Sequence, residues 1–143
     1  AKSGEEKFKA NKGILHKLKS KKKYLKELYF IRNSGLFLKE FYLEKNPDVA
    51  KAECNPLKHY ILHGAYEERD PSPCFSTSYY LLNNPNVVEA GMNPLYHYLR
   101  FGWKQGRNPS PDFITDAYMQ NNPEIVERSI NPLLHYMKES DEL

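Results

Sequence analysis

Apolar and aromatic residues along this chain come in short clusters, and each cluster lies next to an Asn-Pro pair. In the middle of the sequence these clusters are "YYLL" at 79–82, "VV" at 87–88 and "LYHYL" at 95–99. No stretch alternates apolar and polar residues over the length of a strand, so the pattern favours short helices. Asn-Pro pairs such as those at Asn84 and Asn93 end one helix and start the next, because Asn is a favoured N-cap and Pro fits the first helical position.

Three helices are therefore predicted in this part of the chain. They cover 76–84, 85–91 and 94–101, with Gly91 as the C-terminal cap of the second. Helices of this length are marginal in isolation. Their stability has to come from packing against neighbouring helices, and one such unit is not expected to fold alone.

The same signals recur every 38 residues without an insertion. The positions that recur in all three copies are Phe37, Phe75 and Phe113; Tyr42, Tyr80 and Tyr118; Pro47, Pro85 and Pro123; His59, His97 and His135. Gly64 with Gly102, Arg69 with Arg107, and two "PSP" segments recur in the first two copies. A fixed period in this range indicates repeats that share one core.

The predicted fold class is all-α, with tandem 38-residue repeats of three short helices each and a basic N-terminal helix. The predicted boundaries are a basic helical leader at 1–33 and a repeat domain at 34–143, divided into 34–74, 75–112 and 113–143.

Charge is divided unevenly along the chain. The net charge is +3, but residues 1–35 hold ten Lys and one Arg against three Glu, a balance of +8 that leaves the remaining 108 residues at −5. Two cysteines, Cys54 and Cys74, cannot supply a disulfide framework, which favours a reducing compartment. No apolar run reaches the length of a membrane span, so we expect a cytoplasmic location, peripheral at the inner membrane if the leader binds there.

The repeated histidines are predicted to be structural. Equivalent residues of successive repeats are separated by the repeat spacing of about 8 to 10 Å, which is too far for them to share one metal ion. His59 and His63 form the one pair at helical i, i+4 spacing, and the other repeats lack its counterpart. No catalytic residue, metal site or cofactor is predicted, because no nucleophile recurs beside a histidine with an acidic partner.

Three other residues are candidates for ligand binding. Trp103 lies in the segment 103–111, which is predicted to be a proline-stiffened linker, and it matches Ala65 of the first repeat. Arg69 and Arg107 end the equivalent segments. Either arginine could bind an anionic ligand, or it could pin its loop to carbonyls or to a carboxylate such as Asp48.

The leader is predicted to form a helix over 13–35 that ends near Gly35. Ile14, Leu15, Leu18, Leu25, Leu28 and Tyr29 fall close to one face of it. Such a helix could lie on an anionic membrane, bind nucleic acid through phosphates, or connect to a further domain with its apolar face docked on the first repeat. The candidate membrane-surface residues are Lys17, Lys19, Lys21, Lys22 and Lys23.

Residues 34–138 resemble a known repeat of the form F-D-x-x-Y-Y-L-x-x-N-P-D-V-x-x-x-G-x-N-P-L-x-H-Y-L-x-x-G-x-x-E-G-R-x-P-S-P. The phrase "SYYLLNNPNVVEAGMNPLYHYLRFGWKQGRNPSP" carries the resemblance most fully. That repeat occurs in bacterial polysaccharide-synthesis proteins, often beside glycosyltransferase domains, and in some large secreted calcium-binding proteins. The resemblance implies a non-catalytic accessory region of a cell-envelope glycosyltransferase.

The chain departs from that pattern where the pattern has turn residues. Leu38, Ser76 and Ile114 replace the Asp after the first Phe, so only the middle repeat keeps a capping side chain. Glu53 and Ser129 stand where Gly91 keeps the pattern, and Glu68 stands where Gly106 does, which raises the question of whether these turns keep their geometry.

The expected function is an accessory module that holds domains or subunits together or recruits them to a membrane or glycan. The expected partners are the rest of a parent protein or other subunits, with an anionic membrane or a polysaccharide as further possibilities and nucleic acid disfavoured. The alternative is a carbohydrate-binding module that recognises a polysaccharide through loop aromatics.

Overall fold

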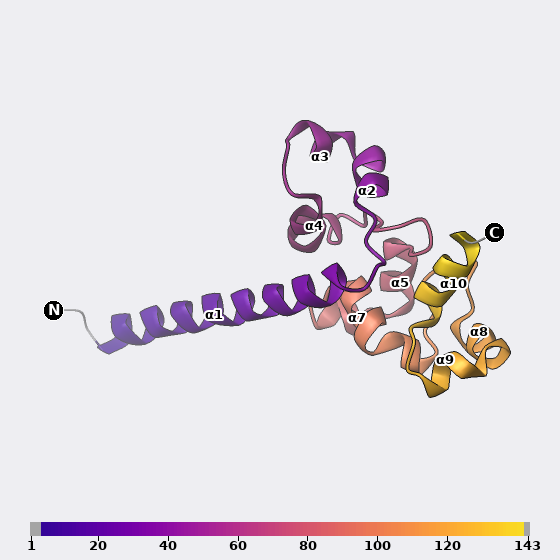
Figure 1. The fold of residues 1–143 in the computed structure, drawn as a ribbon. Coiled ribbons are helices and arrows are strands. Elements are labelled where there is room, and N and C mark those ends of the chain that lie inside the picture. Colours follow the sequence, from indigo (N-terminus) through magenta and orange to yellow (C-terminus); the bar gives the residue numbers. More distant parts are fainter. Residues whose placement is uncertain (1–3, 142–143) are drawn as a thin grey trace.

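The computed structural model describes the backbone of residues 4–141 and the side chains of residue 14 and residues 17–140. Every regular element in this part of the chain is a helix, which confirms the all-α class. In Figure 1 the first helix extends as a rod from one side of a cluster formed by the shorter helices.

The first helix, α1, covers Gly4–Arg32. It begins earlier than the predicted residue 13, and it ends three residues before Gly35, which adopts a left-handed φ of 76° in the following turn. The shorter helices that follow are α2 (Lys39–Lys45), α3 (Pro47–Lys51), α4 (Pro56–His59), a π-helical turn η1 (Tyr60–Gly64), α5 (Thr77–Asn83), α6 (Pro85–Glu89), α7 (Pro94–Arg100), a 3-10 turn η2 (Gly102–Gln105), α8 (Thr115–Asn121), α9 (Pro123–Glu127) and α10 (Pro132–Asp141).

The Asn-Pro pairs act in two different ways. Asn55 and Asn93 are N-caps, since their side-chain oxygens accept hydrogen bonds from Lys58 N and Tyr96 N at 3.0 and 3.1 Å. Asn84 was expected to cap α6 in the same way, but its amide instead donates to Tyr80 O at 2.7 Å. Asn84 therefore closes the end of α5, because its extended backbone turns its side chain back toward that helix.

The turns that lack the pattern's glycine keep a left-handed backbone. Gly91 has a φ of 62°, and the equivalent residues Glu53 and Ser129 have φ values of 53° and 52°. Glu68 has a φ of 61° where Gly106 has 72°. The replacements thus preserve the turn and place side chains in a conformation that costs L-residues energy.

The core is continuous and is lined by the recurring aromatic residues. Phe37, Phe75 and Phe113 each stack on the first-helix tyrosine of the same repeat with ring centroids 5.2 to 5.3 Å apart. One cluster of buried residues extends from Ile31 of α1 to Leu133 of α10. No short helix has a core of its own.

Candidate functional site

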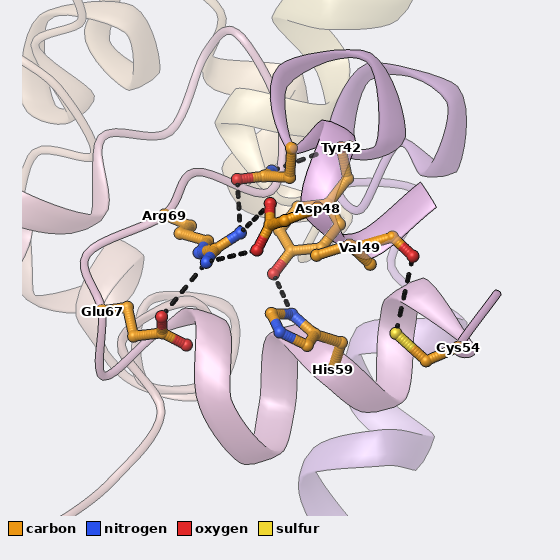
Figure 2. Close-up of polar contacts among 8 residues, drawn as sticks. Tyr42, Asp48, Val49, Cys54, His59, Glu67 and Arg69 are labelled. Carbon is orange, nitrogen blue, oxygen red and sulfur yellow. Dashed lines mark hydrogen bonds and ion pairs between the residues drawn. The ribbon is translucent and has the colours of Figure 1, made fainter. Parts of the chain in front are cut away.

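Each histidine of the "NPLxHY" phrase is bonded to a tyrosine of the first helix of its own repeat. The distances from Tyr Oη to His Nδ1 are 2.7 Å for Tyr42–His59, 2.6 Å for Tyr80–His97 and 2.6 Å for Tyr118–His135. Figure 2 shows the first pair, with the His59 ring pointing at the Tyr42 hydroxyl. Each histidine is hydrogen-bonded, as expected for a structural residue, but its partner is a helical tyrosine, whereas the expected partner was a helix start or a neighbouring loop.

In the first two pairs, burial favours the neutral form of both side chains. It lowers the pKa of His59 and His97, with Arg69 and Arg107 adding to the effect, and it raises the pKa of Tyr42 and Tyr80. A neutral tyrosine donates, so we assign the proton of the bond to Oη and the acceptor role to Nδ1. This hydrogen bond joins the first and third helices of each of these repeats.

In the first two of these pairs, a glycine packs directly against the tyrosine hydroxyl. A Cβ built on Gly64 would lie 2.0 Å from Tyr42 Oη, and one on Gly102 would lie 2.1 Å from Tyr80 Oη. Both glycines lie in or at a distorted turn, η1 or η2, that brings the backbone onto the hydroxyl. In the third repeat Ser140 takes the glycine's place, and α10 continues as a regular helix through it to Asp141.

Arg69 is held by side chains of its own repeat. It forms a two-pronged pair with Asp48 at 2.9 Å for each bond, and it also donates to Asn46 at 3.0 Å and to Glu67 at 3.1 Å (Figure 2). The hydrogen bond from Arg69 lowers the pKa of Asp48. The interpretation that Arg69 pins its loop to Asp48 is confirmed.

Arg107 occupies the equivalent place with a neutral set of partners. Its Nη1 donates to Asn84 Oδ1 at 2.8 Å and to Asn86 Oδ1 at 2.9 Å. Both arginines therefore tie the end of a repeat to its second helix. Binding of an anionic ligand by either arginine stays a prediction. The guanidinium N–H groups that make these hydrogen bonds already have partners within the chain.

Trp103 does not lie in the proline-stiffened linker that was predicted for 103–111. It belongs to η2, its side chain is buried at 6% exposure, and its Nε1 donates to Leu99 O at 3.0 Å. The Lys104 ammonium lies 5.5 Å from the indole centre. This geometry is that of a core residue, and it leaves no open ring face on which a sugar could stack.

The C-terminal part of α1 docks on the repeats through a buried carboxylate. Glu27 is 3% exposed, its pKa is raised by burial, and its carboxylate pairs with Lys23 and with the backbone N–H of Asn93. The Lys23 ammonium also donates to Gly91 O and to Tyr66 Oη. Lys23 was expected to face a membrane, but it faces the junction between the first two repeats.

The docked face of α1 coincides with the predicted apolar face only at Leu28. Tyr24, Leu28 and Ile31 pack into or against the core. Leu18, Leu25 and Tyr29 are 58%, 50% and 65% exposed. The side chain of Leu15 lies outside the described residues. The helix contacts α7, η1 and α4, and so it bridges the first and second repeats instead of resting on the first alone.

The exposed face of α1 combines lysines with uncovered apolar side chains. Leu18, Lys21, Lys22, Leu25, Lys26, Tyr29 and Phe30 line one shallow depression on it. Lys17 and Lys19 are also exposed. Between residues 17 and 32 the sole carboxylate is Glu27, which is buried and paired, so this face presents positive charge alone.

None of the helices in the described residues is both long enough and apolar enough to cross a membrane. In the same part of the chain no three His, Cys, Asp or Glu side chains gather as ligands for a metal ion.

Comparison of the chain with protein-family models, with curated proteins and with solved structures finds no match.

Sequence reasoning missed two features of the site. Glu27 is a lone acidic residue among lysines, which is the pattern of a surface helix, so the sequence gives no sign of its burial. The contact between Gly64 and Tyr42 had a signal, since this glycine recurs with the tyrosine at a fixed spacing, but the recurrence alone does not reveal that the two residues touch.

Proposed function

We propose that this chain is a non-catalytic helical module of a bacterial cell-envelope glycosyltransferase, and that it recruits its parent protein to the anionic inner surface of the membrane through α1. The first part rests on the resemblance of residues 34–138 to the polysaccharide-synthesis repeat. The second part rests on the exposed face of α1, which is the observation that carries the proposal.

That face has the two properties that binding at an anionic lipid surface requires. Its lysines supply attraction of about 1 kcal/mol each near such a surface. Its exposed Leu18, Leu25 and Tyr29 supply apolar area that can enter the headgroup region. Attraction to phosphates alone would need the lysines but would gain nothing from the uncovered leucines, and for this reason we favour a membrane over nucleic acid.

The carbohydrate-binding alternative has weaker support. Tyr42, Tyr80 and Tyr98 are fully buried, and Trp103 is nearly so. A sugar ring needs an open aromatic face, and these residues present none.

Sedimentation with lipid vesicles tests recruitment. The chain is expected to sediment with vesicles that contain phosphatidylglycerol, to stay in solution with phosphatidylcholine alone, and to be released by salt. The double variant Lys21→Glu/Lys22→Glu should bind at least about tenfold more weakly, because it reverses two charges on the exposed face. Leu25→Ser should also weaken binding, because it removes apolar area from the same face.

The matched control is Lys51→Glu/Lys58→Glu, which makes the same change in net charge on exposed positions of the first repeat. This variant should bind as the unaltered chain does. Equal loss in both double variants would mean that net charge alone drives binding, and absence of vesicle binding at low salt would rule out recruitment by α1. Binding of a nucleotide sugar by this chain would contradict the non-catalytic assignment separately.

A further inference from the structure

A pocket of about 350 Å³ lies at the junction of the first and second repeats. Its lining is mainly apolar and includes Ala65 and Tyr66 from the end of the first repeat and Leu82, Val87, Val88 and Met92 from the second. It lies apart from the exposed face of α1, and the proposal below does not depend on membrane recruitment.

The next junction explains why this space is open. A shift of 38 residues places Trp103 at the position of Ala65. The same backbone hydrogen bond surrounds both residues: Arg69 N donates to Gly64 O at 2.9 Å, and Arg107 N donates to Gly102 O at 3.0 Å. Trp103 is buried at 6% exposure, so the second copy has a buried indole at the position where the first copy has alanine. At the first junction alanine leaves the corresponding space without a side chain.

The residues around Ala65 are more apolar than those around Trp103, as expected if a ligand binds in the pocket at Ala65. Around the open pocket, Tyr66, Leu82 and Val88 are 63%, 82% and 57% exposed. At the second junction the residues equivalent to Tyr66 and Leu82 are the polar Lys104 and Gln120, whereas Val126, the equivalent of Val88, is apolar and 50% exposed. Uncovered apolar side chains around an open pocket are a feature of binding sites.

We propose that the pocket at Ala65 binds a tryptophan side chain presented by a partner polypeptide. The indole is the group that the chain itself places at the equivalent position, and Tyr66 can cover its ring as the Lys104 ammonium covers Trp103. A free aromatic molecule would leave Leu82 and Val88 in water. A peptide with apolar residues on either side of the tryptophan covers them, and so the rim favours a polypeptide over a small molecule.

Titration of the whole, isotopically labelled chain by NMR tests this proposal. The probes are N-acetyl-tryptophanamide, the peptide acetyl-Ser-Leu-Trp-Leu-Ser-amide, and the same peptide with alanine in place of tryptophan. We expect saturable shifts at the amides of Leu82, Val88 and Gly91. The tryptophan peptide should bind at least about tenfold more tightly than N-acetyl-tryptophanamide and than the alanine peptide.

Ala65→Trp should fill the pocket and weaken peptide binding at least about tenfold. Ala52→Trp, which adds the same side chain at an exposed position of the same repeat, should leave binding unchanged. If Ala65→Trp does not fold, Val88→Lys on the rim replaces it. Its matched control is Val126→Lys, because Val126 is the equivalent residue of the third repeat and is 50% exposed.

Each other outcome overturns a stated part of the proposal. Peptide binding that survives both Ala65→Trp and Val88→Lys, or no saturable binding at all, would overturn the site. Equal binding of N-acetyl-tryptophanamide and the peptide would assign the pocket to a small aromatic ligand and overturn the polypeptide partner. Equal binding of the alanine peptide and the tryptophan peptide would overturn the assignment of the indole as the bound group.

Discussion

At the scale of single residues, a tyrosine hydroxyl and a glycine share one small volume in the first two repeats. The Tyr80 hydroxyl bonds to His97 and lies where a side chain at position 102 would begin. The glycine is needed there for space and not for a left-handed φ, because the left-handed glycines are Gly35, Gly91 and Gly106.

A double-mutant cycle tests this shared volume. Gly102→Ala should destabilise the protein by about 1 to 3 kcal/mol through overpacking. Tyr80→Phe should cost about 1 to 2 kcal/mol, because buried His97 Nδ1 loses its donor. In the double variant the alanine Cβ would meet Tyr80 Cζ at 3.4 Å, an ordinary contact, where the hydroxyl would lie at 2.1 Å.

The two changes together should therefore cost less than their sum by about 1 kcal/mol or more, as measured by urea unfolding. Strict additivity would show that the glycine and the hydroxyl do not compete for space.

The buried His97 makes stability depend on pH in a defined direction. Its folded pKa is lowered below the ordinary 6.5, by burial first and by nearby Arg107 second. The unfolded chain therefore binds the proton more readily, so this stabilisation is present above pH 6.5 and is lost as pH falls from 6.5 through the folded pKa.

His97→Asn removes that titration and leaves an amide oxygen that can accept from Tyr80. The wild-type chain is expected to be more stable than His97→Asn at pH 7.5, by about 1 kcal/mol. The gap should narrow as the pH is lowered to about 5, because only the wild-type chain has this imidazole to protonate. Thermal unfolding of both proteins across this range measures the gap, and a gap independent of pH would contradict the lowered pKa.

At the scale of elements, the turn after each second helix is fixed by the need to reverse direction before the next Asn-Pro start. The repeats meet this need with Glu53, Gly91 and Ser129, all with left-handed backbone. Glycine adopts this conformation freely, whereas other residues pay about 1 to 2 kcal/mol for it.

Reciprocal substitutions at this turn should change stability in opposite directions. Glu53→Gly should stabilise the protein by about 0.5 to 1 kcal/mol, since relief of the left-handed strain exceeds the added entropy of the unfolded chain. Gly91→Ala should destabilise it by a similar amount. The cost is conformational, because a Cβ at Gly91 would approach only the Lys23 ammonium, at 4.0 Å.

Chemical denaturation of the two variants beside the wild-type chain provides the measurement. A loss of stability in Glu53→Gly would mean that the glutamate side chain contributes more than its backbone costs.

The same elements show what a sequence of this kind can predict. The starts at Pro47, Pro85 and Pro94 are fixed by local chemistry, since Asn-Pro leaves few backbone choices, and the helices lie where these pairs place them. The distorted turns η1 and η2 could not be predicted, because they result from a tertiary contact between Gly64 or Gly102 and a tyrosine 22 residues earlier.

At the scale of the whole molecule, the repeats and α1 share one core. The buried cluster extends from Ile31 to Leu133 through all three repeats, and α1 lies across the junction of the first two. The apolar pattern of α1 does not predict how this helix docks on the repeats. Leu18, Leu25 and Tyr29 belong to its most regular apolar stripe and stay exposed, whereas Glu27 and Lys23 make polar contacts at the docked face.

The pocket is a second feature of the whole molecule that the sequence alone does not predict. The mismatch between Ala65 and Trp103 is visible in the sequence, and alone it marks the tryptophan as the unusual residue. The fold reverses that interpretation, because Trp103 is buried and Ala65 lines an open pocket.

The length of α1 has a mechanical consequence. Its 29 residues span about 44 Å, and its N-terminal part extends beyond the cluster of shorter helices in Figure 1. Lys23, near the point where the rod meets the cluster, bonds to Gly91 and Tyr66, two residues that line the pocket. A force on the projecting part of α1 therefore exerts a torque at Lys23, and through the bonds of Lys23 it also acts on Gly91 and Tyr66 at the pocket.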